Sequence, residues 1–214
     1  MARAPRVVLR IELQKRSKER IVHFSLDVNA WHARTPSVSQ ARPACCPACE
    51  AAGQVPGERV TLVGHGVRLR QVRGPATPEG AAKVVTVVTR RYRCRACGAV
   101  IAVVPQGIAA RRHFSAGAIG LGLLLYAVLR VPTGELAMRI GLWGRGLSAW
   151  RTVVRWMQAI DRGALLARAR LRRAPSDWPP RSRAERAAMA LASLCPDSAC
   201  PLATRVFVGA ALAA

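Results

Sequence analysis

Residues 46–49 and 94–98 form two short motifs, Cys46-Pro47-Ala48-Cys49 and Cys94-Arg95-Ala96-Cys97-Gly98. Two thiolates separated by two residues can hold one metal ion from a tight turn. Two such turns supply the tetrahedral four-sulfur shell that Zn²⁺ favours. Gly98 suits the second turn, because a backbone amide must approach a sulfur closely there. The spacing therefore predicts a structural zinc site with four ligands: Cys46, Cys49, Cys94 and Cys97.

The sequence also offers alternatives to this ligand set. Cys45 could replace its neighbour Cys46, although the Cys-x-x-Cys spacing fits better. His65, between two glycines, is either an exposed turn residue, a metal ligand or a phosphate contact. Two unrelated thiol turns remain the structural alternative, whereas a thioredoxin-like redox pair is disfavoured because no βαβ pattern surrounds either motif. We interpret Cys195 and Cys200 as reduced thiols.

β-Branched runs surround the two cysteine motifs. They predict strands over residues 59–63, 67–72, 84–92 and 100–104, with a turn or bulge at residues 64–66 and a loop at residues 75–80. So small a β unit has little core, so metal binding would contribute much of its folding energy. We therefore predict a zinc ribbon over residues 45–112. Residues 1–44 are expected to form an arm, with a hairpin of strands 6–13 and 20–27 and a linker over residues 29–44.

Helical periodicity marks residues 113–173. Ser115 is expected to cap a helix that runs through residue 129, and Thr133 to cap a second over residues 134–140, which Gly141 ends. Ser148 is expected to cap a third helix over residues 149–172. Residues 174–214 are expected to hold a linker, a helix near residues 183–194 and a small apolar end. The predicted fold is α+β, a small N-terminal β zinc ribbon followed by a helical helix-turn-helix bundle.

The second and third of these helices have features of a DNA-reading unit. Ala137 and Gly141 have the Ala-x-x-x-Gly spacing common at the start of a helix-turn-helix. Arg151 and Arg155 lie one turn apart, on a face that could enter the major groove. An apolar stripe would pack inward, comprising Trp150, Val153, Val154, Met157 and Ile160. The alternative is an ordinary three-helix bundle whose arginines are solvated.

The chain is strongly basic, with 34 Lys and Arg residues against 11 Asp and Glu residues and a formal net charge of +23. Such an excess attracts polyanions, of which DNA is the expected partner. An anionic membrane and a basic surface without a specific partner are the alternatives. Candidate phosphate contacts near the cysteine motifs are Arg68, Arg70, Arg90, Arg91 and Arg93, together with Arg73.

Residues 1–20 are charged throughout and lack the apolar core of a secretory signal. The uncharged run over residues 116–129 is shorter than the ~20 residues that cross a bilayer. We therefore expect a cytoplasmic, nucleoid-associated protein without a membrane partner. In that compartment the paired cysteines favour metal over disulfides.

The order of these motifs resembles the amino-terminal part of bacterial insertion-sequence transposases. Cys46, Cys49, Cys94 and Cys97 match the zinc ligands there, and Arg155-Trp156 matches the end of the reading helix. The match spans about residues 45–160. In that family an acidic-triad nuclease domain usually follows. Here only three carboxylates follow Asp161, namely Asp177, Glu185 and Asp197.

We therefore expect a zinc-dependent DNA-binding protein that is an accessory or truncated component of a transposition system and has no enzymatic activity of its own. Its partners would be DNA and a separate transposase subunit. A stand-alone transcriptional regulator is one alternative, and a zinc ribbon that binds another protein is a second. A nuclease is disfavoured because paired acids and a His-rich site are missing from the sequence.

Overall fold

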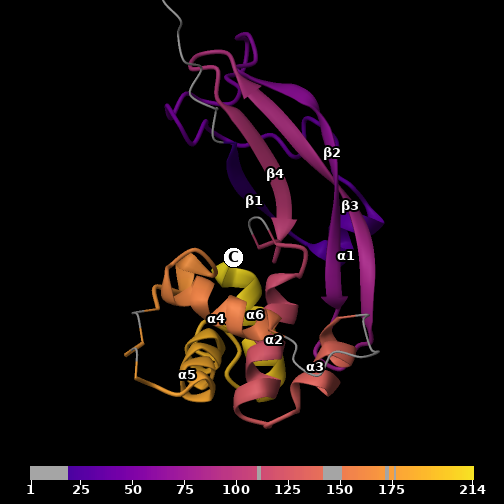
Figure 1. The fold of residues 1–214 in the computed structure, drawn as a ribbon. Helices are drawn as coiled ribbons and strands as arrows, with labels where there is room; N and C mark the ends of the chain where they lie inside the picture. The colour runs from indigo at the N-terminus through magenta and orange to yellow at the C-terminus, as the bar shows by residue number, and fades with distance from the viewer. Residues whose placement is uncertain (1–18, 110–111, 142–150, 172–173, 176) are drawn as a thin grey trace, which may run out of the picture.

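The computed structural model describes residues 19–109, 112–141, 151–171, 174–175 and 177–214. Within these ranges the fold is α+β, with one four-stranded mixed sheet and six α-helices. The strands precede all helices except α1 along the chain, and Figure 1 shows the sheet standing above the helical part. The predicted α+β class is therefore confirmed.

The sheet has the strand order β1-β4-β3-β2. Strands β2 (Leu62–Pro75) and β3 (Ala82–Cys94) form a long antiparallel hairpin, and its loop over residues 76–81 contains all of the predicted loop 75–80 except Pro75, which ends β2. Strand β4 (Val100–Gln106) pairs antiparallel with β3, and β1 (Arg20–Asp27) pairs parallel with β4. Both cysteine motifs lie at the end of the sheet where β3 stops and β4 begins.

The predicted strands over residues 59–63 and 67–72 belong largely to one strand, β2. Residues 64–66 form a bulge, where the register against β3 shifts between Gly64 and Val67. Glycines suit a turn and a bulge equally well, so the local sequence left both possibilities open. Pairing with the uninterrupted β3 selects the bulge, because it keeps the two halves in one ladder.

The expectation of a linker over residues 29–44 is wrong at its start. Helix α1 (Val28–Ala33) begins there, capped by Asp27, whose Oδ1 accepts from Asn29 N at 2.7 Å and from Ala30 N at 2.9 Å. Trp31 is fully buried, and its Nε1 donates to the Val88 carbonyl at 2.8 Å. A helix of six residues is too short to show an apolar periodicity in the sequence. Its stability comes from one aromatic ring packed on the sheet.

Strand β1 was expected as half of a hairpin. Its first predicted partner, residues 6–13, lies outside the described residues, and within them β1 pairs with β4. Residues 20–33 therefore complete the same sheet unit as the predicted ribbon, rather than a separate arm. The parallel pairing joins segments far apart in the chain, which a local pattern does not reveal.

Helix α2 (Ala116–Ala127) is the centre of the helical part. The Ser115 hydroxyl accepts from Ala118 N at 3.1 Å, as the predicted cap requires, and the helix ends two residues before the predicted end. Nearly every residue of α2 is buried, and α3, α4, α5 and α6 all contact it. Among the described helices, none is both long enough and apolar enough to cross a membrane.

The remaining helices correct several expected boundaries. Helix α3 (Thr133–Ile140) starts at Thr133 itself, with Pro132 as its N-cap and Gly141 as its C-cap. Helix α4 (Thr152–Asp161) ends well before the predicted residue 172, because Gly163 follows its C-cap residue. A short 3₁₀ turn (Ala167–Ala169) comes next, then α5 (Pro180–Ala192) and α6 (Leu202–Ala213), which was expected only as an apolar end. The predicted cap Ser148 and the stripe residue Trp150 lie outside the described residues.

The buried apolar residues of the described chain form two separate hydrophobic cores. One lies between the sheet and α1 and contains Trp31, Leu62, Tyr92 and two cysteines, Cys46 and Cys94. The other lies among α2 to α6. Backbone hydrogen bonds join the two parts, from Arg73 N to the His113 carbonyl at 2.7 Å and from Ser115 N to the Arg73 carbonyl at 3.0 Å.

Candidate metal centre and basic surface

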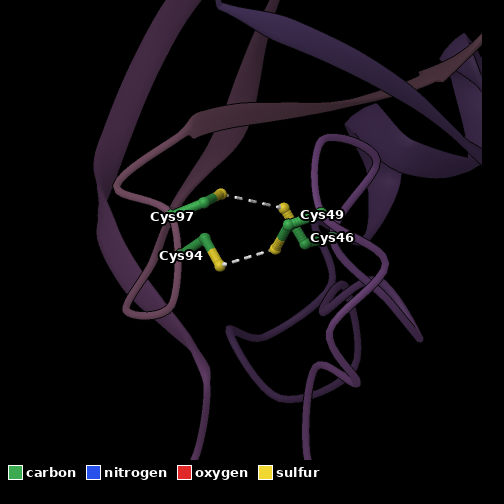
Figure 2. A group of neighbouring side chains, drawn as sticks. All are labelled: Cys46, Cys49, Cys94 and Cys97. Atoms are coloured by element: carbon green, nitrogen blue, oxygen red, sulfur yellow. Dashed lines mark hydrogen bonds between the residues drawn. The ribbon is translucent and has the colours of Figure 1, made fainter.

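Four cysteines converge at one end of the sheet. The Sγ atoms of Cys46, Cys49, Cys94 and Cys97 all lie within 4.8 Å of one another. Figure 2 shows the two motifs facing each other, with Cys46 Sγ 3.7 Å from Cys97 Sγ and Cys49 Sγ 3.7 Å from Cys94 Sγ. The structure thus brings together the four predicted ligands from loops far apart in the chain.

The two cysteine turns have the same backbone pattern. In the first, Cys46 N donates to the Ala51 carbonyl at 2.9 Å and Glu50 N donates to the Cys46 carbonyl at 2.8 Å. In the second, Cys94 N donates to the Ala99 carbonyl at 2.9 Å and Gly98 N to the Cys94 carbonyl at 2.9 Å. Each turn therefore holds its two thiols with the same local geometry.

The separations between the sulfurs fit a tetrahedral metal site. With metal–sulfur bonds of about 2.3 Å, the edges of such a tetrahedron measure about 3.8 Å. The two cross-motif distances of 3.7 Å match this value. They also exceed the ~2.0 Å of a disulfide bond. The four thiols are therefore positioned to bind one metal ion, and the site is compatible with zinc.

The surroundings of Cys46 favour its thiolate. Burial raises the pKa of Cys46, but the backbone amides of Ala48 and Cys49 and the neighbouring thiols outweigh burial and bring the pKa down to about 7. For Cys49 the balance is reversed: the Ala51 amide lowers its pKa, but hydrogen bonds with the neighbouring thiols and burial raise it to about 12. Backbone amides that point at a sulfur stabilise its negative charge, as a metal-binding thiolate needs.

The alternative ligands lie outside this group. Cys45 is exposed and makes an isolated β-bridge with Ala52. His65 is exposed in the β2 bulge. Cys200 donates to an Asp197 carboxylate oxygen at 3.1 Å, and Cys195 to the Asp197 carbonyl at 3.4 Å. In the part of the chain that the structure describes, the metal-binding group contains none of these residues.

Most of the candidate phosphate-binding arginines share one face of the sheet. Alternate residues of a strand point to opposite faces, and directly paired residues point to the same face. On β3, residues 91 and 93 share a face, while residues 68 and 70 of β2 pair with residues 89 and 87 on that same face. We call this surface the arginine face, comprising Arg68, Arg70, Arg91 and Arg93.

Arg90 points to the opposite, covered face of the sheet. Its Nε donates to the Pro36 carbonyl at 2.9 Å, beside Tyr92, whose hydroxyl donates to the Val38 carbonyl at 2.7 Å. The segment after α1 covers this face. Arg90 therefore ties that segment to the sheet, and we leave it out of the candidate surface.

The four arginines of the arginine face differ in their exposure and in their partners within the chain. Arg93 is exposed, whereas Arg68 and Arg91 both form ion pairs with Glu19. Arg70 is half-buried, and its Nη2 donates to the Ala109 and Arg112 carbonyls. Burial, and secondarily the charge of Arg68, lowers the pKa of Arg70. Arg70 thus holds the chain that leads into α2.

A cavity of about 480 Å³ opens on this face, and its lining includes Glu19, Arg68, Arg70, Arg112 and His113. His23 of β1 points to the same face, because it pairs with Val104, another lining residue. Burial and the charges of Arg168 and Arg70 lower the pKa of His23 from 6.5 to about 4. Burial is the largest cause of this shift, and the two guanidinium charges add to it in the same direction.

Both predicted reading arginines are exposed, Arg155 on α4 and Arg151 at the N-cap position before it. Val153, Met157 and Ile160 of the predicted stripe are buried. Val154 is an exception, because it lies on the exposed side with 38% of its surface accessible. Trp156 is buried instead, with its ring centroid 5.2 Å from that of Phe114.

The predicted helix-turn-helix can be followed only in part. Helices α3 and α4 both contact α2, and α3 also contacts β2 and β3. Ala137 is buried, but the described helices α3 and α4 are not in substantial contact with each other. The linking residues 142–150 lie outside the described residues, so the reading unit remains a prediction.

Comparisons with protein-family models, curated proteins and solved structures found no match to this chain.

Sequence reasoning missed Glu19 and His23. Glu19 follows a run of basic residues and has no motif around it, and His23 is a single histidine in an apolar strand. Only strand pairing brings either side chain to the arginine face. Neither position carries a sequence signal that could have identified it.

Proposed function

We propose that this protein is a zinc-dependent DNA-binding protein. The observation that carries the proposal is the arginine face, where four guanidinium groups from two strands line one side of the sheet beside a cationic cavity. With a formal net charge of +23, the chain is also attracted to polyanions from a distance. Backbone phosphates are the natural ligands of such a surface.

Zinc has a structural role in this proposal. Four thiolates fill a tetrahedral shell and leave no open position for a substrate. Two of the ligands, Cys46 and Cys94, are buried in the sheet core, so the metal would fasten residues 45–62 to the β3–β4 turn. It would thereby hold Arg93, one residue before Cys94, in place.

We further propose that the chain acts with a separate catalytic subunit, as an accessory component of a transposition system. The support comes from two carboxylates, those of Asp161 and Asp197, that already have partners within the chain. Asp161 Oδ2 lies 2.7 Å from Arg183 Nη2, and Asp197 accepts from Cys200 and from Ala199 N. Carboxylates used in this way are poorly placed to hold the metal ions of phosphoryl transfer.

Arg93→Ala tests the proposed surface. We expect weaker binding to duplex DNA whatever its sequence, and a salt dependence flatter by about one counterion. The matched control is Arg34→Ala, because Arg34 is exposed on the α1 side of the sheet. Titrations at several salt concentrations measure both effects. Equal losses in the two variants would contradict the assignment of the arginine face.

A further inference from the structure

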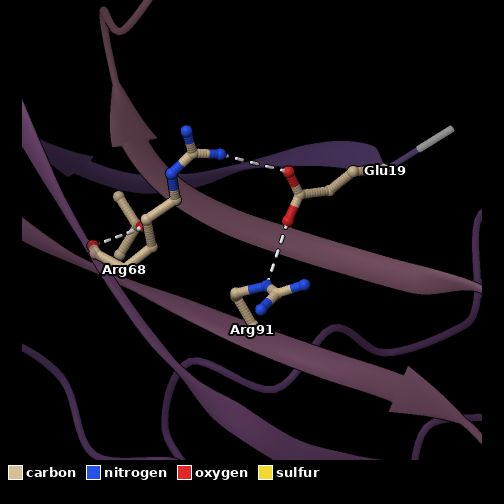
Figure 3. Close-up of polar contacts among 4 residues, drawn as sticks. Glu19, Arg68 and Arg91 are labelled. Carbon is tan, nitrogen blue, oxygen red and sulfur yellow. Dashed lines mark hydrogen bonds and ion pairs between the residues drawn. The ribbon is translucent and has the colours of Figure 1, made fainter.

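One carboxylate connects two arginines that are not paired with each other in the sheet. Figure 3 shows Glu19 between Arg68 and Arg91, with Arg91 Nε 3.1 Å from Glu19 Oε1 and Arg68 Nη1 3.8 Å from Glu19 Oε2. Each oxygen of the carboxylate thus faces a different strand. Two guanidinium groups that converge on the two oxygens of one anion form a ready-made site for an oxyanion.

Glu19 lies on the same face as these arginines but belongs to the opposite edge of the sheet. It directly precedes β1, while Arg91 and Arg68 lie on β3 and β2, so its side chain crosses β4. The β4 residue that pairs with Arg91 is Ala102, whose small side chain leaves room above the strand. The contact is therefore a long-range one that depends on the complete sheet.

The ion pairs are open to solvent and carry excess positive charge. The side chains of Arg68, Arg91 and Glu19 are 71%, 34% and 31% exposed. Two cations against one anion leave a net positive site. Ion pairs this open to solvent are weak, so a second anion can compete for the arginines.

The site continues into the cavity of the arginine face. Glu19 and Arg68 line that cavity together with Arg70, Arg112 and His113. His23 lies on the same face, where burial first, and then the charges of Arg168 and Arg70, lower its pKa. An anion bound between Arg68 and Arg91 would therefore have further cationic neighbours, as successive phosphates of a nucleic-acid backbone require.

We propose that Arg68 and Arg91 form a phosphate-binding subsite, which Glu19 fills in the free protein and a backbone phosphate of DNA takes over on binding. This inference rests on the proposed function, and it makes Glu19 a competitor of the DNA phosphate for the two arginines. Glu19 offsets the repulsion between the two guanidinium groups and orients them when DNA is absent. Binding then exchanges one oxyanion for another at the same donors.

The test is Glu19→Gln, measured by titration with a duplex DNA at several salt concentrations. Removing the competing charge should strengthen binding about three- to tenfold and steepen the salt dependence by up to one counterion. The gain should disappear in the background of the double variant Arg68→Ala/Arg91→Ala. Glu185→Gln, at an exposed position of α5, makes the same charge change away from the subsite.

The DNA titrations separate a failure of the subsite from a failure of the proposed function. An equal gain from Glu185→Gln, or a gain that survives without Arg68 and Arg91, would overturn the subsite. Wild-type protein that binds DNA no less tightly than Glu19→Gln would also overturn it, while leaving the DNA-binding proposal intact. If neither binds DNA at low salt, the proposed function itself fails. Thermal unfolding and zinc content of each variant show that the fold is preserved.

Discussion

At the scale of single residues, the two cysteine turns differ at one equivalent position. Glu50 and Gly98 each donate their backbone N–H to the first cysteine of their turn, and both have positive φ, 60° at Glu50 and 73° at Gly98. Glycine adopts this conformation without steric cost, whereas a side chain there costs about 1 kcal/mol. The first turn therefore carries a strain that the second avoids.

Opposite substitutions at these positions should have opposite effects. We expect Gly98→Ala to lower the stability of the zinc-loaded protein by about 1 kcal/mol, or about 2–4 °C in Tm. Open space around the Gly98 Cβ position leaves the backbone as the only source of this cost. Glu50→Gly should raise stability by about 0.5 kcal/mol, since relief of strain exceeds the added freedom of the unfolded chain. Thermal unfolding measures both, and a destabilised Glu50→Gly would contradict the equivalence of the turns.

His23 should make the fold sensitive to acid. Its pKa is about 4 in the folded chain and 6.5 for an ordinary histidine, so the unfolded chain binds the proton more readily. The stability that neutral His23 provides is complete above about pH 6.5 and is lost as the pH falls toward 4. Because the site is partly open to solvent, the loss is on the order of 1 kcal/mol.

We expect His23→Leu to remove this part of the pH dependence. Acid also releases zinc from thiolates, so the quantity to measure is the stability difference between the variant and wild type at each pH. Denaturant unfolding at pH 7.5, 6.5 and 5.5 should show that difference shifting in favour of the variant as pH falls. A difference independent of pH would show that His23 does not contribute.

At the scale of elements, the exposed arginines of α4 and those of the arginine face suit two different kinds of DNA contact. Arg151 and Arg155 are exposed on one side of the helix, whereas its other side packs against α2. A helix with such a free basic side can enter the major groove, where arginine recognises guanine. The arginine face is different, because we propose that its side chains bind backbone phosphates and not bases.

The two surfaces should therefore respond differently to DNA sequence. Arg151→Ala or Arg155→Ala should cost ~1–3 kcal/mol on a selected site and less on scrambled DNA. Arg93→Ala should weaken both DNAs about equally. Parallel titrations on the two DNAs measure the contrast. Uniform losses in all three variants would remove the assignment of α4 as a reading helix.

At the scale of the whole molecule, two separate cores predict two responses to metal loss. The sheet core includes Cys46 and Cys94, whereas the helical core contains no member of the cysteine group. A metal ion bound by thiolates contributes directly to the folding of the part that it holds. The helical part has its own apolar interior, centred on α2.

We expect one zinc per chain, and loss of that zinc in Cys94→Ser. The variant, or wild type treated with a chelator, should lose the ordered sheet end while α2, α5 and α6 remain helical. Elemental analysis gives the metal content, and hydrogen exchange locates the loss of structure. Full zinc content and an unchanged exchange pattern in Cys94→Ser would reject the four-cysteine site.

Several features followed from neighbouring residues alone. The Cys-x-x-Cys turns, the Ser115 cap of α2 and the Gly141 end of α3 were all predicted and are present in the structure. Each depends on contacts within a few residues, since a thiol pair, a capping hydroxyl or a terminal glycine acts on its own turn. The sequence could therefore identify the four cysteines that converge, as well as the helix boundaries that have such signals.

Two of the missed features, the burial of Trp31 and the pairing of β1, depend on distant contacts. Trp31 is buried because β3 supplies a carbonyl and an apolar surface, and β1 joins this sheet because β4 is available for parallel pairing. Neither partner lies near its counterpart in the chain, so neither contact leaves a periodic pattern in the sequence.

The sequence by itself determined the paired thiols, the capped helices and the large positive charge, because these are properties of a residue and its immediate neighbours. Tertiary structure alone decided what the arginines do. Strand register puts Arg91 and Arg68 on the open face with Glu19 and turns Arg90 toward Pro36 on the covered one. Adjacent arginines are alike in composition, but the alternation of a strand sends them to opposite faces, and only the packing of the sheet makes one of those faces accessible.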